Sequence, residues 1–211
     1  MLYQSLLNKA AHLKLLRLCG IIFYVKNSSS NYHHSKHINR ANWLNKPMMS
    51  GGYYHWLVDK GSLTARLKQK FSDFLVKPVQ LIYAKPFLDE AAPLTISVRK
   101  NALIREVMLM GDKQELVFAH SVLPRSSLRG EWVGLSRLGN RPLGATLFAN
   151  PQVKRTPLTY KKLYPHHVLY QHATSSMNVR HPYLWARRSV FTLNCANIMV
   201  TEVFLPQLLA T

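Results

Sequence analysis

Two pairs of apolar runs, each joined by a few polar residues, constrain the fold of this chain more than any other feature. Residues 103–122 hold two such runs that meet at Gly111-Asp112, and residues 190–205 hold two more that meet across Asn194–Asn197. Apolar runs on both sides of a short turn-forming link are typical of β-hairpins, in which neighbouring strands are antiparallel. The sequence therefore predicts two hairpins and an antiparallel sheet built from them.

Helix signals lie between the hairpins and before them. Ser62 is a good N-cap for a helix whose apolar side chains run from Leu63 to Phe74. Pro124–Leu138 has the spacing of an amphipathic helix. We also expect Pro142 at the first position of a helix over Leu143–Ala149, because proline is favoured there. The middle and the end of the chain therefore read as alternating strands and helices.

The remaining segments are less regular. Leu94–Val98 is a short strand candidate, and residues 150–183, which contain four prolines, are predicted to be mostly loop. Residues 1–40 differ from the rest, and we expect them to be a basic, poorly ordered N-terminal extension. A secretory signal is one alternative, but no small-residue cleavage site follows the apolar run Leu18–Val25. A targeting peptide is the other, since the segment is basic, has no acidic residue and is rich in serine and histidine. The folded part is therefore predicted to be one domain over residues 41–211.

Charge and cysteine content exclude several classes of protein. The 211 residues carry a formal charge of +19, and the first acidic residue is Asp59. This sign favours an anionic partner, such as nucleic acid, a membrane surface or a metabolite with carboxylates. Two cysteines are too few for a disulfide framework or a cysteine-based zinc site. No run reaches the roughly 18 apolar residues that a membrane span requires.

Two ionised side chains occupy unexpected positions in the predicted strands. By strand parity, Arg105 lies on the same face as Leu103 and Val107, and Glu202 lies on an apolar face of the second hairpin. A charge on an apolar face is costly unless it has a partner. The two residues therefore pair with each other, sit at a sheet edge, or line a pocket. Glu106 has the opposite parity and is predicted to be solvated.

Other candidate residues have ordinary explanations. The clusters HHSKH (residues 33–37) and HHVLYQH (residues 166–172) lack the spacing and the acids of a metal site, so no metal is expected. Arg187 and Arg188 alternate across a predicted strand start. One of the two could face the core and support Glu202, while the other is solvated.

Five segments, in this order, resemble the chorismate pyruvate-lyase family, which makes 4-hydroxybenzoate for ubiquinone. They are WLVDKGSLTARL (Trp56–Leu67), LIREVML (Leu103–Leu109), LGNRPLGATLF (Leu138–Phe148), LWARRS (Leu184–Ser189) and VTEVFLP (Val200–Pro206). The resemblance covers residues 43–211. It implies one α+β domain, with an antiparallel sheet flanked by helices that cover an enclosed ligand pocket. It also implies conversion of chorismate to 4-hydroxybenzoate and pyruvate with no cofactor.

The resemblance also implies roles for individual residues. The carboxylate-binding arginine of the family falls on Arg105, and its buried acid beside the aromatic hydroxyl falls on Glu202. The two main-chain ligand contacts fall on Leu63 and Leu143. His120 stands where the family has an arginine, and we expect it to bind substrate at the entrance of the pocket.

The mechanism and the competing functions stay open at this stage. Glu202 would either hydrogen-bond the C4 hydroxyl of chorismate or act as base for the C4 hydrogen. A further cation, His120 or Arg66, would face the second carboxylate of the substrate. The alternatives to a cytoplasmic, monomeric lyase are a non-catalytic small-molecule sensor domain of the same fold and a nucleic-acid-binding protein. No nucleic-acid-binding motif supports the latter, so no specific nucleic-acid partner is expected.

Overall fold

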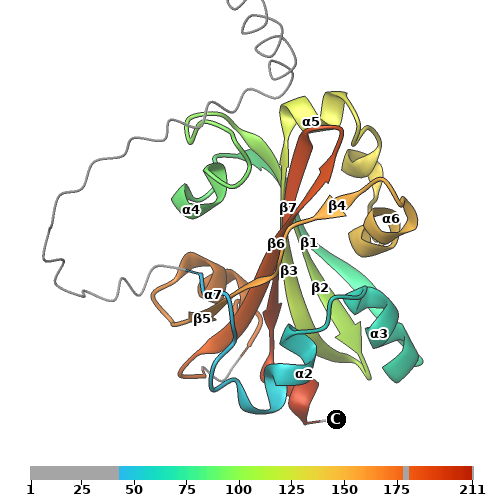
Figure 1. Cartoon of the computed structure of the whole chain (residues 1–211). Coiled ribbons are helices and arrows are strands. Elements are labelled where there is room, and N and C mark those ends of the chain that lie inside the picture. Colours follow the sequence, from blue (N-terminus) through green and yellow to red (C-terminus); the bar gives the residue numbers. More distant parts are fainter. Residues whose placement is uncertain (1–42, 178–180, 211) are drawn as a thin grey trace, which may run out of the picture. The chain divides into compact units, whose positions relative to one another are not determined.

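A computed structural model describes residues 43–177 and 181–210 of the chain (Figure 1). The predictions for residues 1–40, including the first histidine cluster, lie outside the described residues. The strands are β1 (Leu75–Ala84), β2 (Ala102–Gly111), β3 (Gln114–Pro124), β4 (Lys154–Arg155), β5 (Thr159–Leu163), β6 (Leu184–Leu193) and β7 (Ala196–Phe204). The α-helices are α2 (Tyr54–Leu57), α3 (Leu63–Lys70), α4 (Leu88–Ala91), α5 (Arg125–Arg129), α6 (Leu143–Ala149) and α7 (Val168–Ala173). Short 3₁₀ turns are η1 (Gly51–Tyr53), η2 (Leu135–Arg137) and η3 (Pro206–Leu209).

The seven strands of the described residues form one antiparallel sheet, which confirms the predicted α+β fold. The strand order is β1-β2-β3-β7-β6-β4, and β5 also pairs with β6. Both predicted hairpins are present, as β2–β3 and β6–β7. The first turn is made by Asp112 and Lys113, whose φ angles of 50° and 62° suit a two-residue hairpin turn. The carboxylate of Asp73 accepts hydrogen bonds from both of these backbone N–H groups, at 2.6 and 3.1 Å.

Gly111 serves packing rather than the turn. It is the last residue of β2, and a Cβ atom there would lie 2.6 Å from Cγ of Phe71. The ring of Phe71, just after α3, therefore packs directly on the strand backbone. This contact anchors α3 against the sheet, and Ser62 caps the start of the same helix by accepting a hydrogen bond from Ala65 N at 3.3 Å.

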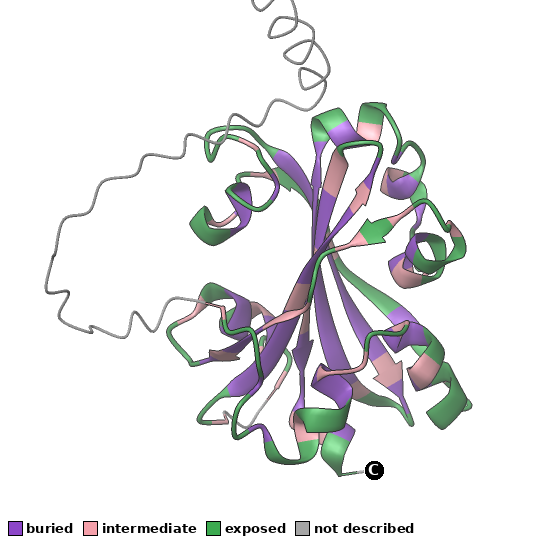
Figure 2. Cartoon of the chain, in the orientation of Figure 1, coloured by how far each residue is buried: buried purple, intermediate pink, exposed green. Residues whose placement is uncertain are grey.

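Both faces of the central strands are buried (Figure 2). We call the face that carries Arg105 and Glu202 the front face, and the face that carries Glu106 and His120 the back face. The front face packs against α2, α3 and the segment from α5 to α6, through residues such as Leu67, Trp132 and Leu143. The back face packs against α4 and α7, through residues such as Leu94, Leu169 and Tyr170. Helices thus cover the sheet on both sides.

Several sequence predictions were wrong in detail. Leu94–Val98 is not a strand, because Thr95 has a left-handed φ of 57° and interrupts any extended run. The predicted helix over Pro124–Leu138 is broken into α5 and η2, since Gly134 takes a φ of 92° between them. Pro142 is the N-cap of α6 rather than its first residue. More than half of the described residues in segment 150–183 lie outside helices and strands, as predicted, but the segment also holds β4, β5 and α7.

Strand β1 was not predicted at all. It lies at the edge of the sheet, contains Pro78, and has a register irregularity between Pro78 and Gln80 that disturbs the alternation of side chains. Among the described residues, no helix has both the length and the apolar character needed to cross a membrane.

Candidate active site

A pocket lies on the front face, between the sheet and the starts of α3 and α6. Its lining is mainly apolar, and among the described residues only three lining side chains are charged: Arg105, Arg155 and Glu202. The empty space between the lining atoms, together with the open solvent that adjoins it, is about 580 Å³. The pocket face of the sheet is thus apolar with a few fixed charges, as the strand parity of Arg105 and Glu202 predicted.

Arg105 reaches the pocket from β2 and does not pair with Glu202. The residue is only 4% exposed, and its Nη2 donates hydrogen bonds to the carbonyls of Gly139 and Arg141 at 3.0 and 2.9 Å. Its Nε and Nη1 make no hydrogen bond with the residues that the structure describes. Burial lowers the pKa of the Arg105 guanidinium, but an arginine stays charged at physiological pH. The side chain therefore holds the loop before α6 and still has donors for an anion.

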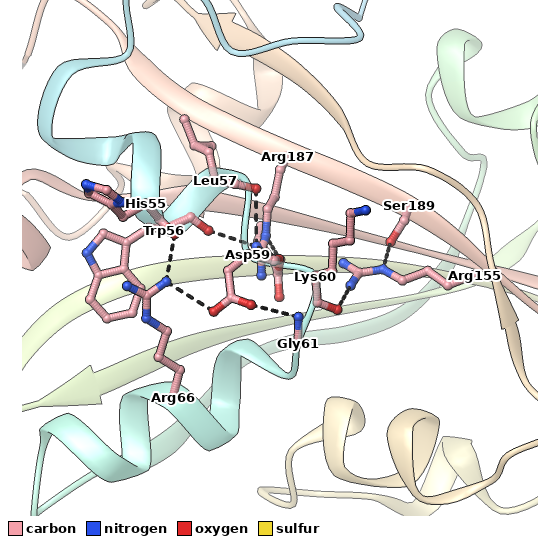
Figure 3. A network of polar contacts seen from close by, with 11 residues as sticks. His55, Trp56, Leu57, Asp59, Lys60, Gly61, Arg66, Arg155, Arg187 and Ser189 are labelled. Atoms are coloured by element: carbon pink, nitrogen blue, oxygen red, sulfur yellow. Dashed lines mark hydrogen bonds and ion pairs between the residues drawn. The ribbon is translucent and has the colours of Figure 1, made fainter.

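Glu202 enters the pocket from β7 and is held by its cross-strand neighbour Arg187. The Arg187 Nε donates to Glu202 Oε2 at 2.5 Å, while Nη1 binds the backbone carbonyls of Trp56, Leu57 and Asp59 (Figure 3). Glu202 Oε1 has no hydrogen-bond partner among the described residues. This arrangement confirms that Arg187 supports Glu202, and it leaves one carboxylate oxygen available to a ligand.

Arg155, from β4, is the pocket residue that sequence reasoning missed. Its Nε donates to Ser189 Oγ at 2.8 Å and its Nη1 donates to the Lys60 carbonyl at 2.9 Å (Figure 3). Its guanidinium also lies 5.1 and 5.5 Å from the ring centres of Phe191 and Phe148. Burial lowers the pKa of Arg155, which the charge of Glu202 partly offsets. No periodicity marked this residue, because β4 is only two residues long.

The two residues expected to offer main-chain contacts, Leu63 and Leu143, both line the pocket. They are the first residues of α3 and α6. The starts of the two helices touch, since a Cβ on Gly144 would lie 3.5 and 3.6 Å from the hydroxyls of Thr64 and Ser62. A main-chain role for Leu63 and Leu143 stays a prediction.

His120 does not line this pocket, so the expectation that it binds substrate at the entrance does not fit the structure. It lies on the back face of β3 and is only 2% exposed. Its Nδ1 is 2.8 Å from Glu106 Oε1, and its Nε2 is 3.1 Å from Glu90 Oε1, although that N–H does not point at the oxygen. His172 of α7 also binds Glu106 Oε1, at 2.8 Å. The parity of His120 on β3, opposite to that of Ser121, could have revealed this from sequence.

The prediction that Glu106 is solvated was also wrong. The residue is 2% exposed because α4 and α7 cover the back face. Burial alone would raise the pKa of Glu106, but its bonds to His120 and His172 lower it below the usual value. Burial alone would likewise lower the pKa of His120, but Glu106 and Glu90 outweigh it and raise that pKa to about 9. His120 is therefore an imidazolium at neutral pH.

The fold and the pocket are those of an α+β protein with a cationic cavity for a small molecule. A family model described as chorismate lyase matches residues 37–211. A probable chorismate pyruvate-lyase of Thiobacillus denitrificans is 49% identical, covering 73% of this chain and 82% of that protein. A second, from Methylobacillus flagellatus, is 44% identical over 81% of this chain and 96% of the relative. The chain therefore belongs to the chorismate lyase family of enzymes.

Solved structures with a similar fold are more distant. The effector domain of PhnF from Mycobacterium smegmatis matches with a TM-score of 0.49 and 13% identity, over 70% of this chain and 90% of that domain.

Proposed function

We propose that this protein converts chorismate to 4-hydroxybenzoate and pyruvate. The observation that carries the proposal is the pocket itself, in which Arg105 and Glu202 project from different strands into one apolar cavity. Chorismate has a carboxylate at ring position C1 and a hydroxyl opposite it at C4. An arginine and an acid on separate strands suit these two polar ends of a flat ring.

The reaction requires little chemical activation. The C3–O ether bond breaks, C4 loses its hydrogen as a proton, and the C–H electron pair becomes the third double bond of the ring. Enolpyruvate leaves with the electron pair of the C–O bond, takes up one proton, and tautomerises to pyruvate. Because aromatisation drives these steps, the protein has to orient the ring and manage one proton.

The residues of the pocket divide this work. Arg105 binds the ring carboxylate through donors that its loop carbonyls leave free. Glu202, fixed by Arg187, offers Oε1 either to the C4 hydroxyl or to the C4 hydrogen. The backbone N–H groups of Leu63 and Leu143 add polar contacts at the helix starts. The apolar lining excludes water from the reacting ring.

A direct assay tests the proposal. Full-length protein is incubated with chorismate, pyruvate is measured with lactate dehydrogenase and NADH, and 4-hydroxybenzoate is measured by chromatography. We expect both products in equal amounts and no turnover with heat-denatured protein. Stoichiometric binding of chorismate without either product would overturn the lyase proposal and support a sensor domain. The same assay with residues 1–40 deleted tests the domain boundary, since we expect unchanged turnover.

We also propose the setting in which the enzyme acts. It works as a cytoplasmic monomer and supplies the first committed step of the ubiquinone ring pathway. Its substrate and both of its products are small, water-soluble acids, which supports a site of action in the cytoplasm. Light scattering on the purified protein would show a mass near 24.2 kDa for a monomer. A mass near twice that value would contradict this part of the proposal.

A further inference from the structure

We propose that Arg155 binds the second carboxylate of the substrate, the one on the enolpyruvyl group that leaves. The inference rests on the proposed function and assigns a residue to the half of chorismate that Arg105 and Glu202 leave unaccounted for. It starts from the observation that Arg155 is the second arginine lining the pocket.

The guanidinium of Arg155 is fixed in orientation before any ligand arrives. Nε is bound to Ser189 Oγ and Nη1 to the Lys60 carbonyl, while two phenylalanine rings lie within 5.5 Å. Both hydrogen-bond partners are neutral, and Nη2 has no hydrogen-bond partner among the described residues. A rigid cation with only neutral partners and a free donor is suited to an anionic ligand.

The charges in and under the pocket match a dianion. Among the described residues, Arg105, Arg155 and Glu202 are the charged lining groups. The charge of Glu202 is balanced by its ion pair with Arg187, which does not line the pocket. Two positive charges therefore remain without a carboxylate partner. Chorismate carries two carboxylates, so each arginine has one to bind.

The sheet register shows which arginine takes which carboxylate. Arg105, Ser121, Val200 and Ser189 form one cross-strand row through β2, β3, β7 and β6. Strands lie about 4.8 Å apart, so Arg105 and Ser189 start roughly 14 Å from each other. Glu202 lies on β7, which is two strands away from β2, the strand of Arg105. The next strand after β7 is β6, which carries Ser189, and Arg155 is hydrogen-bonded to the Ser189 hydroxyl. Arg155 is thus on the Glu202 side of the pocket.

This placement agrees with the shape of the substrate. The ring carboxylate at C1 and the hydroxyl at C4 are on opposite sides of the ring, and the enolpyruvyl ether at C3 is next to C4. A ring held between Arg105 and Glu202 therefore directs its enolpyruvyl group toward the side on which Arg155 lies. The two cations considered from sequence do not compete, because His120 is on the back face and Arg66 does not line the pocket but binds Asp59 and the His55 carbonyl.

A comparison of substrate binding with product binding tests this role of Arg155, because 4-hydroxybenzoate lacks the enolpyruvyl carboxylate. A residue that binds only that carboxylate affects chorismate and not 4-hydroxybenzoate. We expect Arg155→Leu to raise KM for chorismate by about 10- to 100-fold, the loss typical of one charged hydrogen-bonding partner. The Kd for 4-hydroxybenzoate, measured by calorimetry, should change less than about threefold. Arg155→Lys keeps the positive charge but cannot donate two parallel hydrogen bonds to a carboxylate, so it should recover only part of the loss.

Two results with Arg155→Leu would contradict a role of Arg155 in binding the enolpyruvyl carboxylate. An equal loss of chorismate and 4-hydroxybenzoate binding would show that Arg155 only supports the loop at Lys60, and an unchanged KM would remove Arg155 from substrate binding. Either result overturns the inference while leaving the proposed reaction intact. Failure of the wild-type protein to release pyruvate would instead overturn the proposed reaction, and product binding by Arg155→Leu shows that the variant folds.

Discussion

The two faces of the sheet both bury ionised side chains, but they differ in whether those side chains have oppositely charged partners. On the back face, the carboxylates of Glu90 and Glu106 meet the imidazoles of His120 and His172 at 2.8–3.1 Å. On the front face, Arg187 binds the carboxylate of Glu202, while Arg105 and Arg155 line the pocket and have no carboxylate partner among the described residues. On the back face each of the two carboxylates thus lies beside an imidazole, whereas on the front face two arginines lack a carboxylate partner among the described residues.

This difference separates groups that hold the fold from groups that await a ligand. Buried charges are costly unless paired, and the back-face carboxylates have imidazole partners within the chain itself, so this cluster needs no ligand. The positive excess on the front face is tolerated because carbonyl and hydroxyl oxygens partly compensate it. A dianionic ligand would complete it. Substitutions on the back face should therefore change stability, and those on the front face should change substrate binding and turnover.

The largest expected effect is on the back face. Replacing His120 by leucine removes the imidazolium that lies between Glu106 and Glu90 and leaves Glu106 with His172 alone. Removal of one partner of a buried charge pair typically costs about 3–5 kcal/mol of unfolding free energy. Denaturant unfolding at pH 7 measures the loss. His166→Leu, at an exposed histidine of the loop before α7, is the matched control and should have little effect. Equal stability of the two variants would contradict the contrast between the faces.

The pH dependence of that loss sharpens the test. The Glu106 and Glu90 carboxylates raise the pKa of His120 to about 9 in the folded protein, against about 6.5 for a histidine in an unfolded chain. Its stabilising contribution is therefore fully present below about pH 6.5 and is lost as the pH rises through 9. The gap in stability between wild type and His120→Leu should narrow between pH 7 and pH 10. A constant gap would mean that packing of the ring, and not its charge, stabilises the back face.

Glu202→Gln should give the next largest effect, and on turnover rather than stability. The amide keeps the shape but cannot take a proton, so we expect kcat to fall by about 100-fold or more if Glu202 is the base. KM should change much less. A kcat close to that of wild type would limit Glu202 to orienting the C4 hydroxyl. Either result decides between the two roles that the sequence left open.

Arg105→Ala should act mainly on binding. Loss of one charged anchor weakens both chorismate and 4-hydroxybenzoate by about 10- to 100-fold, because both carry the ring carboxylate. Calorimetry with the product and steady-state kinetics with the substrate measure the two losses. Arg125→Ala, at an arginine that lies over the ring of Tyr83, is the control and should leave both values unchanged. A loss confined to chorismate would place the ring carboxylate elsewhere.

The same contrast explains what the sequence could predict. Strand parity placed Arg105 and Glu202 on the front face because each stands among apolar residues of a strand in a regular hairpin. The same logic failed for Glu106, since it assumed that one face of the sheet meets water, and helices cover both. The resemblance to the family places His120 at the entrance of the pocket, although the parity of His120 on its strand puts it on the back face.

Two further errors have local physical causes. Arg155 could not be found from periodicity because a strand of two residues has none, and only its bond to Ser189 places it in the pocket. Strand β1 was missed because the irregularity near Pro78 removes the alternation that identifies a strand. Sequence patterns therefore predicted the central hairpins and the two residues within them, and tertiary contacts placed the rest.

The smallest expected effect concerns salt. If the front face lacks two negative charges, a dianion is attracted to it, and ions in solution weaken that attraction over a distance of about 10 Å at 0.1 M and 3 Å at 1 M. We expect kcat/KM to fall a few-fold between 0.05 and 0.5 M sodium chloride while kcat stays nearly constant. Arg155→Leu removes one of the two charges, so its salt dependence should be shallower than that of wild type. An identical slope would show that the overall charge of +19, and not the pocket, attracts the substrate.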